Sequence, residues 1–176
     1  MENNGIGKLF EGVDRWTVLI YVLIVLVGFV AILSASYEEG AESIFSFSHF
    51  YMKQLVWMGI SFAVAVVVLL VDASIYHKWA YLFYVLGLLT LVAALLFGRE
   101  VNGAKAWFEI GSVRIQPVEF AKIATALALA RVMSSSSFSI NRAGDLFKVG
   151  LVICLPLLII VMQNDTGSGI VLVSLL

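Results

Sequence analysis

Charged residues are scarce in this sequence. They make up 13% of its 176 residues, whereas soluble domains carry about 25%. The 12 acidic and 11 basic residues nearly cancel, which leaves a net charge of −1. The chain therefore has no overall basic field of the kind that attracts nucleic acid. These two shortages exclude an ordinary soluble domain and a nucleic-acid partner.

Cysteine is almost absent. The single residue, Cys154, lies inside an apolar block and has no partner in the sequence, so neither an internal disulfide nor a cysteine metal site is available. A lone cysteine among apolar residues is typical of a small buried hydrophobic side chain.

Hydrophobic residues dominate instead, at 61% with a mean hydropathy of +1.01. They form uninterrupted blocks near bilayer length rather than alternating with polar residues. We predict an all-α, polytopic transmembrane helix bundle that forms a single domain over residues 1–176. Its five predicted spans and the start of a sixth cover residues 17–35, 55–71, 79–97, 117–133, 149–162 and 170–176.

The fifth block is short. Its 14 residues would rise about 21 Å, against a hydrocarbon core of about 30 Å. After it come QNDTGSG and only seven apolar residues. We therefore expect the sixth helix to be incomplete and the chain to be the N-terminal part of a larger protein.

The distribution of basic residues favours a cytoplasmic N-terminus. This orientation places six lysines and arginines inside and four outside; they are Lys8, Arg15, Lys78, Arg131, Arg142 and Lys148, against Lys53, Arg99, Lys105 and Arg114. The four serines of 134–137 then belong to a cytoplasmic connector. His49 and His77 fall on opposite sides of the membrane, which excludes a shared metal site and leaves no Ser/His/Asp arrangement.

The predicted outer loop, FGREVNGAKAWFEIGSVRIQP, is the densest polar stretch. Asn102-Gly103 is a strong turn signal, and the residues after it alternate between apolar and polar. We expect a short amphipathic or hairpin element at the membrane interface, anchored by Trp107 and Phe108 and leaving Lys105 and Arg114 near lipid phosphates. Two interpretations stay open: an ordinary interfacial loop, or a site for the head group of an anionic lipid substrate.

Three charged residues lie within or beside predicted spans, where a charge is costly unless it has a partner or a polar cavity. Glu119 and Lys122 share one helix face and are close enough to pair. Asp165 follows the short fifth helix and precedes TGSG, which we expect to be an unwound turn. We hypothesise that Lys122 pairs with Asp165 across two helices, lining a cavity open to the outside. The alternative is a purely structural ion pair.

The sequence NGAKAWFEIGSVRIQPVEFAKIATALALARV resembles the NGAKRW, QPSEFAK and LAR signature of the SEDS family, RodA and FtsW. QNDTGSGIVL resembles the QPDLGTALV element that follows it in that family. The order and spacing of both motifs match, and the similarity covers nearly the whole chain. The VRIQP stretch is closer to RodA than to FtsW.

This resemblance implies a ten-helix peptidoglycan glycosyltransferase of the bacterial inner membrane, serving cell shape or cell division. Such a protein polymerises lipid II, a lipid-linked disaccharide-pentapeptide, on the outer face. Its expected partner is a class B penicillin-binding protein that cross-links the product. The resemblance places the general-base aspartate in a later outer loop beyond residue 176, so the catalytic residue stays unknown here and the fragment alone is expected to be inactive.

Matched by motif, the substrate or cavity residues are Gln116, Glu119, Lys122, Asp165, Asn102, Gly103, Lys105 and Trp107. Four positions depart from the family pattern, with Ala106 in place of arginine, Val118 of serine, Asn164 of proline and Thr166 of leucine. Loss of that arginine weakens phosphate binding by the loop, because lysine cannot supply bidentate contacts.

Two other classes of function stay open. Broken helices with charges near mid-membrane are also typical of transporters, so a flippase or transporter of a lipid-linked precursor is one alternative. A non-catalytic scaffold for a penicillin-binding protein is the other. No residue pattern specifies a metal or other cofactor, and a divalent cation for the full-length enzyme is left as an open expectation.

Overall fold

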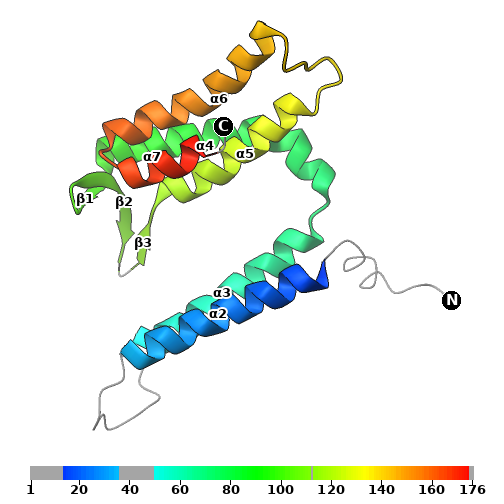
Figure 1. The fold of residues 1–176 in the computed structure, drawn as a ribbon. Helices are drawn as coiled ribbons and strands as arrows, with labels where there is room; N and C mark the ends of the chain where they lie inside the picture. The colour runs from blue at the N-terminus through cyan, green and yellow to red at the C-terminus, as the bar shows by residue number, and fades with distance from the viewer. Residues whose placement is uncertain (1–13, 36–49, 112, 175–176) are drawn as a thin grey trace, which may run out of the picture. The chain divides into compact units, whose positions relative to one another are not determined.

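The computed structural model describes residues 14–35, 50–111 and 113–174. The chain divides into two compact units, Met1–Asp72 and Ala73–Leu176 (Figure 1). Lys8 and His49, on which part of the sequence interpretation rests, lie outside the described residues, as does the end of the predicted sixth helix.

The first unit contains two long apolar helices, α2 (Arg15–Ala35) and α3 (Phe50–Leu70), which contact each other. Asp14 caps α2, since its carboxylate accepts bonds from the Thr17 amide at 2.9 Å and the Thr17 hydroxyl at 2.6 Å. These bonds hold the pKa of Asp14 below its ordinary value and satisfy an amide that helix geometry leaves free. No residue of α2 is buried, as expected for a helix surrounded by lipid.

The second unit contains four helices, α4 (Ala73–Phe97), α5 (Pro117–Met133), α6 (Ala143–Met162) and α7 (Thr166–Val173). Helix α4 packs mainly on α5, and α6 contacts both of them. Helix α7 folds back beside α6, where a Cβ added at Gly169 would lie 3.4 Å from the Leu157 side chain. The chain therefore reverses direction between α6 and α7.

A three-stranded antiparallel sheet joins α4 to α5, in the order β1 (Arg99–Val101), β2 (Ala104–Ile110) and β3 (Val113–Ile115). Val101 pairs with Ala104, so the first turn consists of Asn102 and Gly103 alone. Their φ angles of 53° and 85° are those of a type I′ turn, which favours Asn-Gly. The hairpin prediction is confirmed, and the all-α class is corrected to a mostly helical fold with a small sheet.

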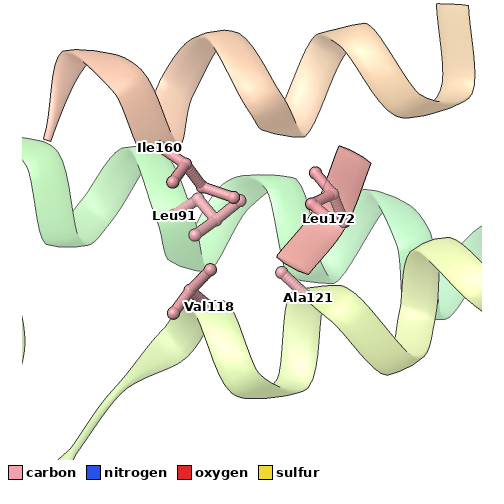
Figure 2. Close-up of a cluster of buried hydrophobic side chains, with 5 residues drawn as sticks. All are labelled: Leu91, Val118, Ala121, Ile160 and Leu172. Carbon is pink, nitrogen blue, oxygen red and sulfur yellow. The ribbon is translucent and has the colours of Figure 1, made fainter. Parts of the chain in front are cut away.

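The core of the second unit gathers one or two side chains from every helix. Leu91, Val118, Ala121, Ile160 and Leu172 are buried and point toward one another (Figure 2). Near them α4 and α5 approach closely, since a Cβ at Gly87 would lie 3.4 Å from the Ala121 Cα and 3.5 Å from the Ala124 Cβ. This contact fixes the N-terminal half of α5, which begins at the sheet.

Most predicted helices are present, with some ends displaced. Residues 117–133 form a helix with the predicted bounds, and 17–35 begins two residues earlier, at Arg15. The second and third predicted helices begin earlier, at Phe50 and Ala73. Helices extend beyond the apolar block because backbone hydrogen bonds continue through polar residues at the membrane surface.

Two predictions about α6 and the segment that follows it are wrong. Helix α6 begins at Ala143, not at 149, so its 20 residues rise about 30 Å, enough to cross a hydrocarbon core. TGSG is not unwound, because Thr166–Gly169 is the first turn of α7. The break is limited to Gln163, Asn164 and Asp165, with Asn164 in the left-handed region at φ 59°.

Four of the described helices, α2, α3, α4 and α6, are long and apolar enough to cross a membrane. Helix α5 was also predicted as a span, but it has only 17 residues and includes Glu119 and Lys122. Most large apolar side chains on the four long helices are exposed, which water would penalise and lipid would not. The chain is a multi-pass membrane protein.

Candidate functional site

The two motifs singled out in the sequence meet where the sheet touches the break between α6 and α7. The backbone amide of Lys105, on β2, donates to the Gln163 carbonyl at 3.0 Å. The Lys105 ammonium donates to the Leu96 carbonyl in the last turn of α4 at 3.0 Å. Lys105 thus connects the hairpin to the C-terminal ends of both α4 and α6. Its ammonium was expected near lipid phosphates, but it has a partner within the protein.

Asp165 is the centre of this junction. Its carboxylate accepts from the Gln116 side-chain amide at 2.9 Å, from the Ser168 hydroxyl at 2.8 Å and from the Ser168 amide at 3.2 Å. The last two bonds make it the N-cap of α7, where the helix dipole also favours a negative charge. The first bond connects α7 to the residue that precedes Pro117, so Asp165 joins the start of α5 to the start of α7.

Gln163, like Ser168, is a residue of the junction that the sequence interpretation missed. Its side chain is 1% exposed, and its amide nitrogen donates to the Leu91 carbonyl in α4 at 2.8 Å. Within the described part of the chain its side-chain oxygen has no hydrogen-bond partner. The sequence did contain a signal for Gln163, because it is a polar residue at the end of an apolar block, just before a turn.

The predicted pairing of Lys122 with Asp165 is wrong. Lys122 instead forms an ion pair with Glu119 one turn earlier, at 2.9 Å, and no ion pair joins it to Asp165 among the described residues. The Lys122 side chain is 21% exposed and that of Glu119 57%. Residues three apart on one helix are neighbours. Contact with a second helix depends also on which way the helix face points, and the depth of a residue in the membrane does not give that direction.

On the sheet, Glu109 is held between two arginines. It accepts from Arg114 at 3.1 Å and pairs also with Arg99, so it links β2 to both neighbouring strands. The Arg114 hydrogen bond, opposed by desolvation and helped by Arg99, lowers the pKa of Glu109. Arg114, which we expected near lipid phosphates, is therefore engaged by a carboxylate.

The other predicted loop residues take structural positions. Asn102 and Gly103 form the turn, and Trp107 is half-buried opposite Arg99. Ala106, at the position where the family pattern has arginine, is 1% exposed. Because Ala106 is buried and β2 contacts α4 and α5, the larger side chain of an arginine there would require neighbouring elements to move.

Across residues 14–35, 50–111 and 113–174, no three His, Cys, Asp or Glu side chains gather into a group that could hold a metal ion. The chemistry of the junction is that of an amide, hydroxyl and carboxylate network. Such a network positions helix ends and binds polar groups.

A model of the family described as cell cycle protein, which groups FtsW, RodA and SpoVE, matches residues 14–176. The chain belongs to this family. The match includes both motifs and every residue of the junction, so the SEDS resemblance read from the sequence is confirmed.

Relatives agree in sequence and in structure. The peptidoglycan glycosyltransferase RodA of Treponema pallidum is 40% identical over 126 residues, which are 68% of this chain and 27% of that protein. The crystal structure of RodA from Thermus thermophilus superposes with a TM-score of 0.79 at 29% identity, covering 93% of this chain and 51% of that one.

A second solved structure is described as a peptidoglycan synthase complex that coordinates polymerization and crosslinking. It matches with a TM-score of 0.78 at 28% identity, over 93% of this chain and 45% of that one. This chain spans less than half the length of the curated relatives it matches, 41% and 43% for the first two, both FtsW proteins.

Proposed function

We propose that this chain forms part of a peptidoglycan glycosyltransferase of the RodA/FtsW type, which polymerises lipid II for the cell wall. The observation that carries the proposal is the family match over residues 14–176, together with the junction in which both motifs of the family signature meet. The bonds from Gln116 to Asp165 and from Lys105 to Gln163 join them.

The proposed setting follows from the same resemblance. The protein lies in the bacterial inner membrane with its N-terminus in the cytoplasm, and α5 is its fourth span. The sheet then faces the periplasm, where lipid II is polymerised. Similarity to a peptidoglycan synthase complex supports a class B penicillin-binding protein as the partner.

Within this function, Asp165 is proposed as a positioning residue. A carboxylate has room for about four hydrogen bonds, and Asp165 already accepts three from Gln116 and Ser168. Holding the starts of α5 and α7 together sets the location of the Glu119 and Lys122 pair, which we propose to line the substrate cavity with Gln116. The general base is expected on a part of the enzyme outside this chain.

The test is polymerisation of purified lipid II by the full-length protein in liposomes, with and without the penicillin-binding partner. We expect glycan polymer on a gel, and none from the 176-residue chain alone. Movement of lipid II between leaflets without polymer would favour a transporter instead. Polymer made only by the partner would favour a scaffold.

The positioning role makes a further prediction. Asp165→Ala removes the cap and the Gln116 bond, so the starts of α5 and α7 lose their fixed positions. We expect the polymerisation rate to fall about tenfold, which corresponds to a free-energy difference of about 1.4 kcal/mol. Asp165→Asn keeps an acceptor for Ser168 and a partner for Gln116, and it should restore at least half of the rate. Equal loss in both variants would show that the charge itself is required.

Asp14→Ala provides the matched control, because it also removes an aspartate N-cap, at α2. It should cost about 1 kcal/mol of helix stability and leave the polymerisation rate unchanged.

A further inference from the structure

A cavity of about 460 Å³ lies at the end of α5 remote from the sheet, away from the junction described above. It is bounded by the first turns of α4 and α6, the last turn of α5, and the serines of 134–137. Its size is that of a small-molecule site. Because it lies at the ends of candidate spans, it opens at a membrane surface.

The lining of this cavity is cationic. Arg131 and Lys148 line it together with one carboxylate, that of Asp145. Asp145 is already paired with Lys148 at 2.8 Å and with Arg142 at 3.5 Å, and its side chain is only 6% exposed. The Arg131 guanidinium has no hydrogen-bond or ion-pair partner among the residues that the structure describes. One positive charge in the lining is therefore left without a protein anion.

Residues with hydroxyl groups line the same cavity. Five of them, the serines of 134–137 and Tyr81, are in the lining together with His77. Three of the serine hydroxyls already have protein partners: those of Ser135 and Ser137 contact each other at 3.0 Å, and that of Ser134 donates to the Arg131 carbonyl at 3.0 Å. Hydroxyl donors around a guanidinium are suited to the oxygens of a phosphate group, which arginine contacts with two parallel hydrogen bonds.

We infer that this cavity binds the phosphate of an anionic phospholipid head group. The location argues for a lipid, since basic pockets between transmembrane helices lie at the depth of lipid phosphates. Trp79, which lies between the lining residues His77 and Tyr81 on α4, is exposed, and the Lys78 ammonium is 5.8 Å from its ring centre. Tryptophan and tyrosine at this height are typical of the membrane interface.

The experiment measures lipid retained by the full chain in nanodiscs of phosphatidylcholine with a minor fraction of phosphatidylglycerol. Native mass spectrometry of the ejected protein counts each lipid. We expect bound phosphatidylglycerol to exceed its share of the bilayer. Arg131→Gln should reduce this excess about fivefold, the effect of one cation near the surface, while Arg131→Lys should keep most of it.

A second variant gives a change of opposite sign. Asp145→Asn removes the negative charge that pairs with Lys148. The asparagine oxygen can still accept the hydrogen bond from the Ser139 amide, so the fold should persist and binding of phosphatidylglycerol should increase. A variant that merely damaged the fold could not raise binding. Arg15→Gln is the matched control and should change nothing, because Arg15 is exposed and forms no ion pair with the residues that the structure describes.

Three outcomes would overturn the inference. They are retention in proportion to bilayer composition, an Asp145→Asn variant that binds less lipid, and an effect of Arg15→Gln equal to that of Arg131→Gln. Displacement of the lipid by millimolar inorganic phosphate would assign the cavity to a soluble phosphate compound and would contradict the lipid assignment. This result is independent of polymerisation activity.

Discussion

At the scale of single residues, the sheet depends on one carboxylate. Glu109 pairs with Arg114, which lies directly opposite it on β3, and also with Arg99 on β1. Because it contacts cations on both outer strands, it holds three short strands together that would be marginal by themselves. The lowered pKa of Glu109 means that these contacts favour its charged form.

Acid should therefore loosen the sheet. A carboxyl whose pKa is lower in the folded state stabilises the fold above the ordinary glutamate pKa, about 4.3, and loses this effect as the pH falls through the lowered folded value. We expect the fluorescence of Trp107, with the other three tryptophans replaced by phenylalanine, to shift to the red below about pH 4. Glu109→Gln should show the shifted emission already at neutral pH.

Glu100→Gln is the control for this measurement. Glu100 is exposed on the same sheet and forms no ion pair among the described residues. Its variant should titrate like the wild type. A pH response that survives in Glu109→Gln would show that another group is responsible.

At the scale of elements, the contact between α4 and α5 is set by the absence of a side chain at Gly87. The Cβ of an alanine there would touch Ala121 and Ala124 at ordinary contact distance, whereas any larger side chain would need the space that α5 occupies. Small residues at such a crossing let membrane helices approach closely.

Gly87→Leu should separate the two helices and destabilise the second unit by about 1 to 3 kcal/mol, the usual cost of overpacking. Gly87→Ala should be neutral or slightly stabilising, because alanine favours helices by about 1 kcal/mol over glycine. Thermal melts in detergent, followed by circular dichroism, measure both. Gly150→Leu, where nothing lies within 4 Å, should leave the midpoint unchanged or raise it slightly, because leucine also favours helices over glycine; a drop equal to that of Gly87→Leu would contradict the packing argument.

The elements also show what the sequence could predict. The bounds of α5 were predictable because Pro117 marks a helix start, and the hairpin because Asn102-Gly103 favours a type I′ turn. The start of α6 was not predictable from hydropathy, because Asp145 and Lys148 interrupt the run of apolar residues while the backbone hydrogen bonds of the helix continue through them. The helical TGSG was missed because its weak local propensity is overcome by the Asp165 cap and by burial of Gly169 and Leu172.

At the scale of the whole molecule, α5 separates two polar regions. The sheet precedes Pro117, and the serines of 134–137 follow Met133. The 17 residues between them rise about 26 Å, somewhat less than the hydrocarbon core. Family membership could be read from the two motifs, whereas the contact between the motifs required coordinates.

Cysteine labelling tests whether α5 crosses the membrane. In a Cys154→Ser background, Glu100→Cys and Ser136→Cys each introduce one exposed thiol. We expect an impermeant maleimide to label position 100 from outside intact cells, and position 136 only in inverted vesicles. Labelling of both positions from the same side would show that α5 does not span.

The hydrogen bond between the Lys105 amide and the Gln163 carbonyl gives the periplasmic sheet of the proposed topology a mechanical link to the interior. The sheet is short, and the Lys105 ammonium holds it to α4, so a tilt of the sheet would pull on the three residues that separate α6 from α7. A protein that docks on the sheet from outside would thereby shift the first turn of α7 and its aspartate. An external partner could then affect the proposed substrate cavity through a shift of one helix start, carried by one backbone hydrogen bond.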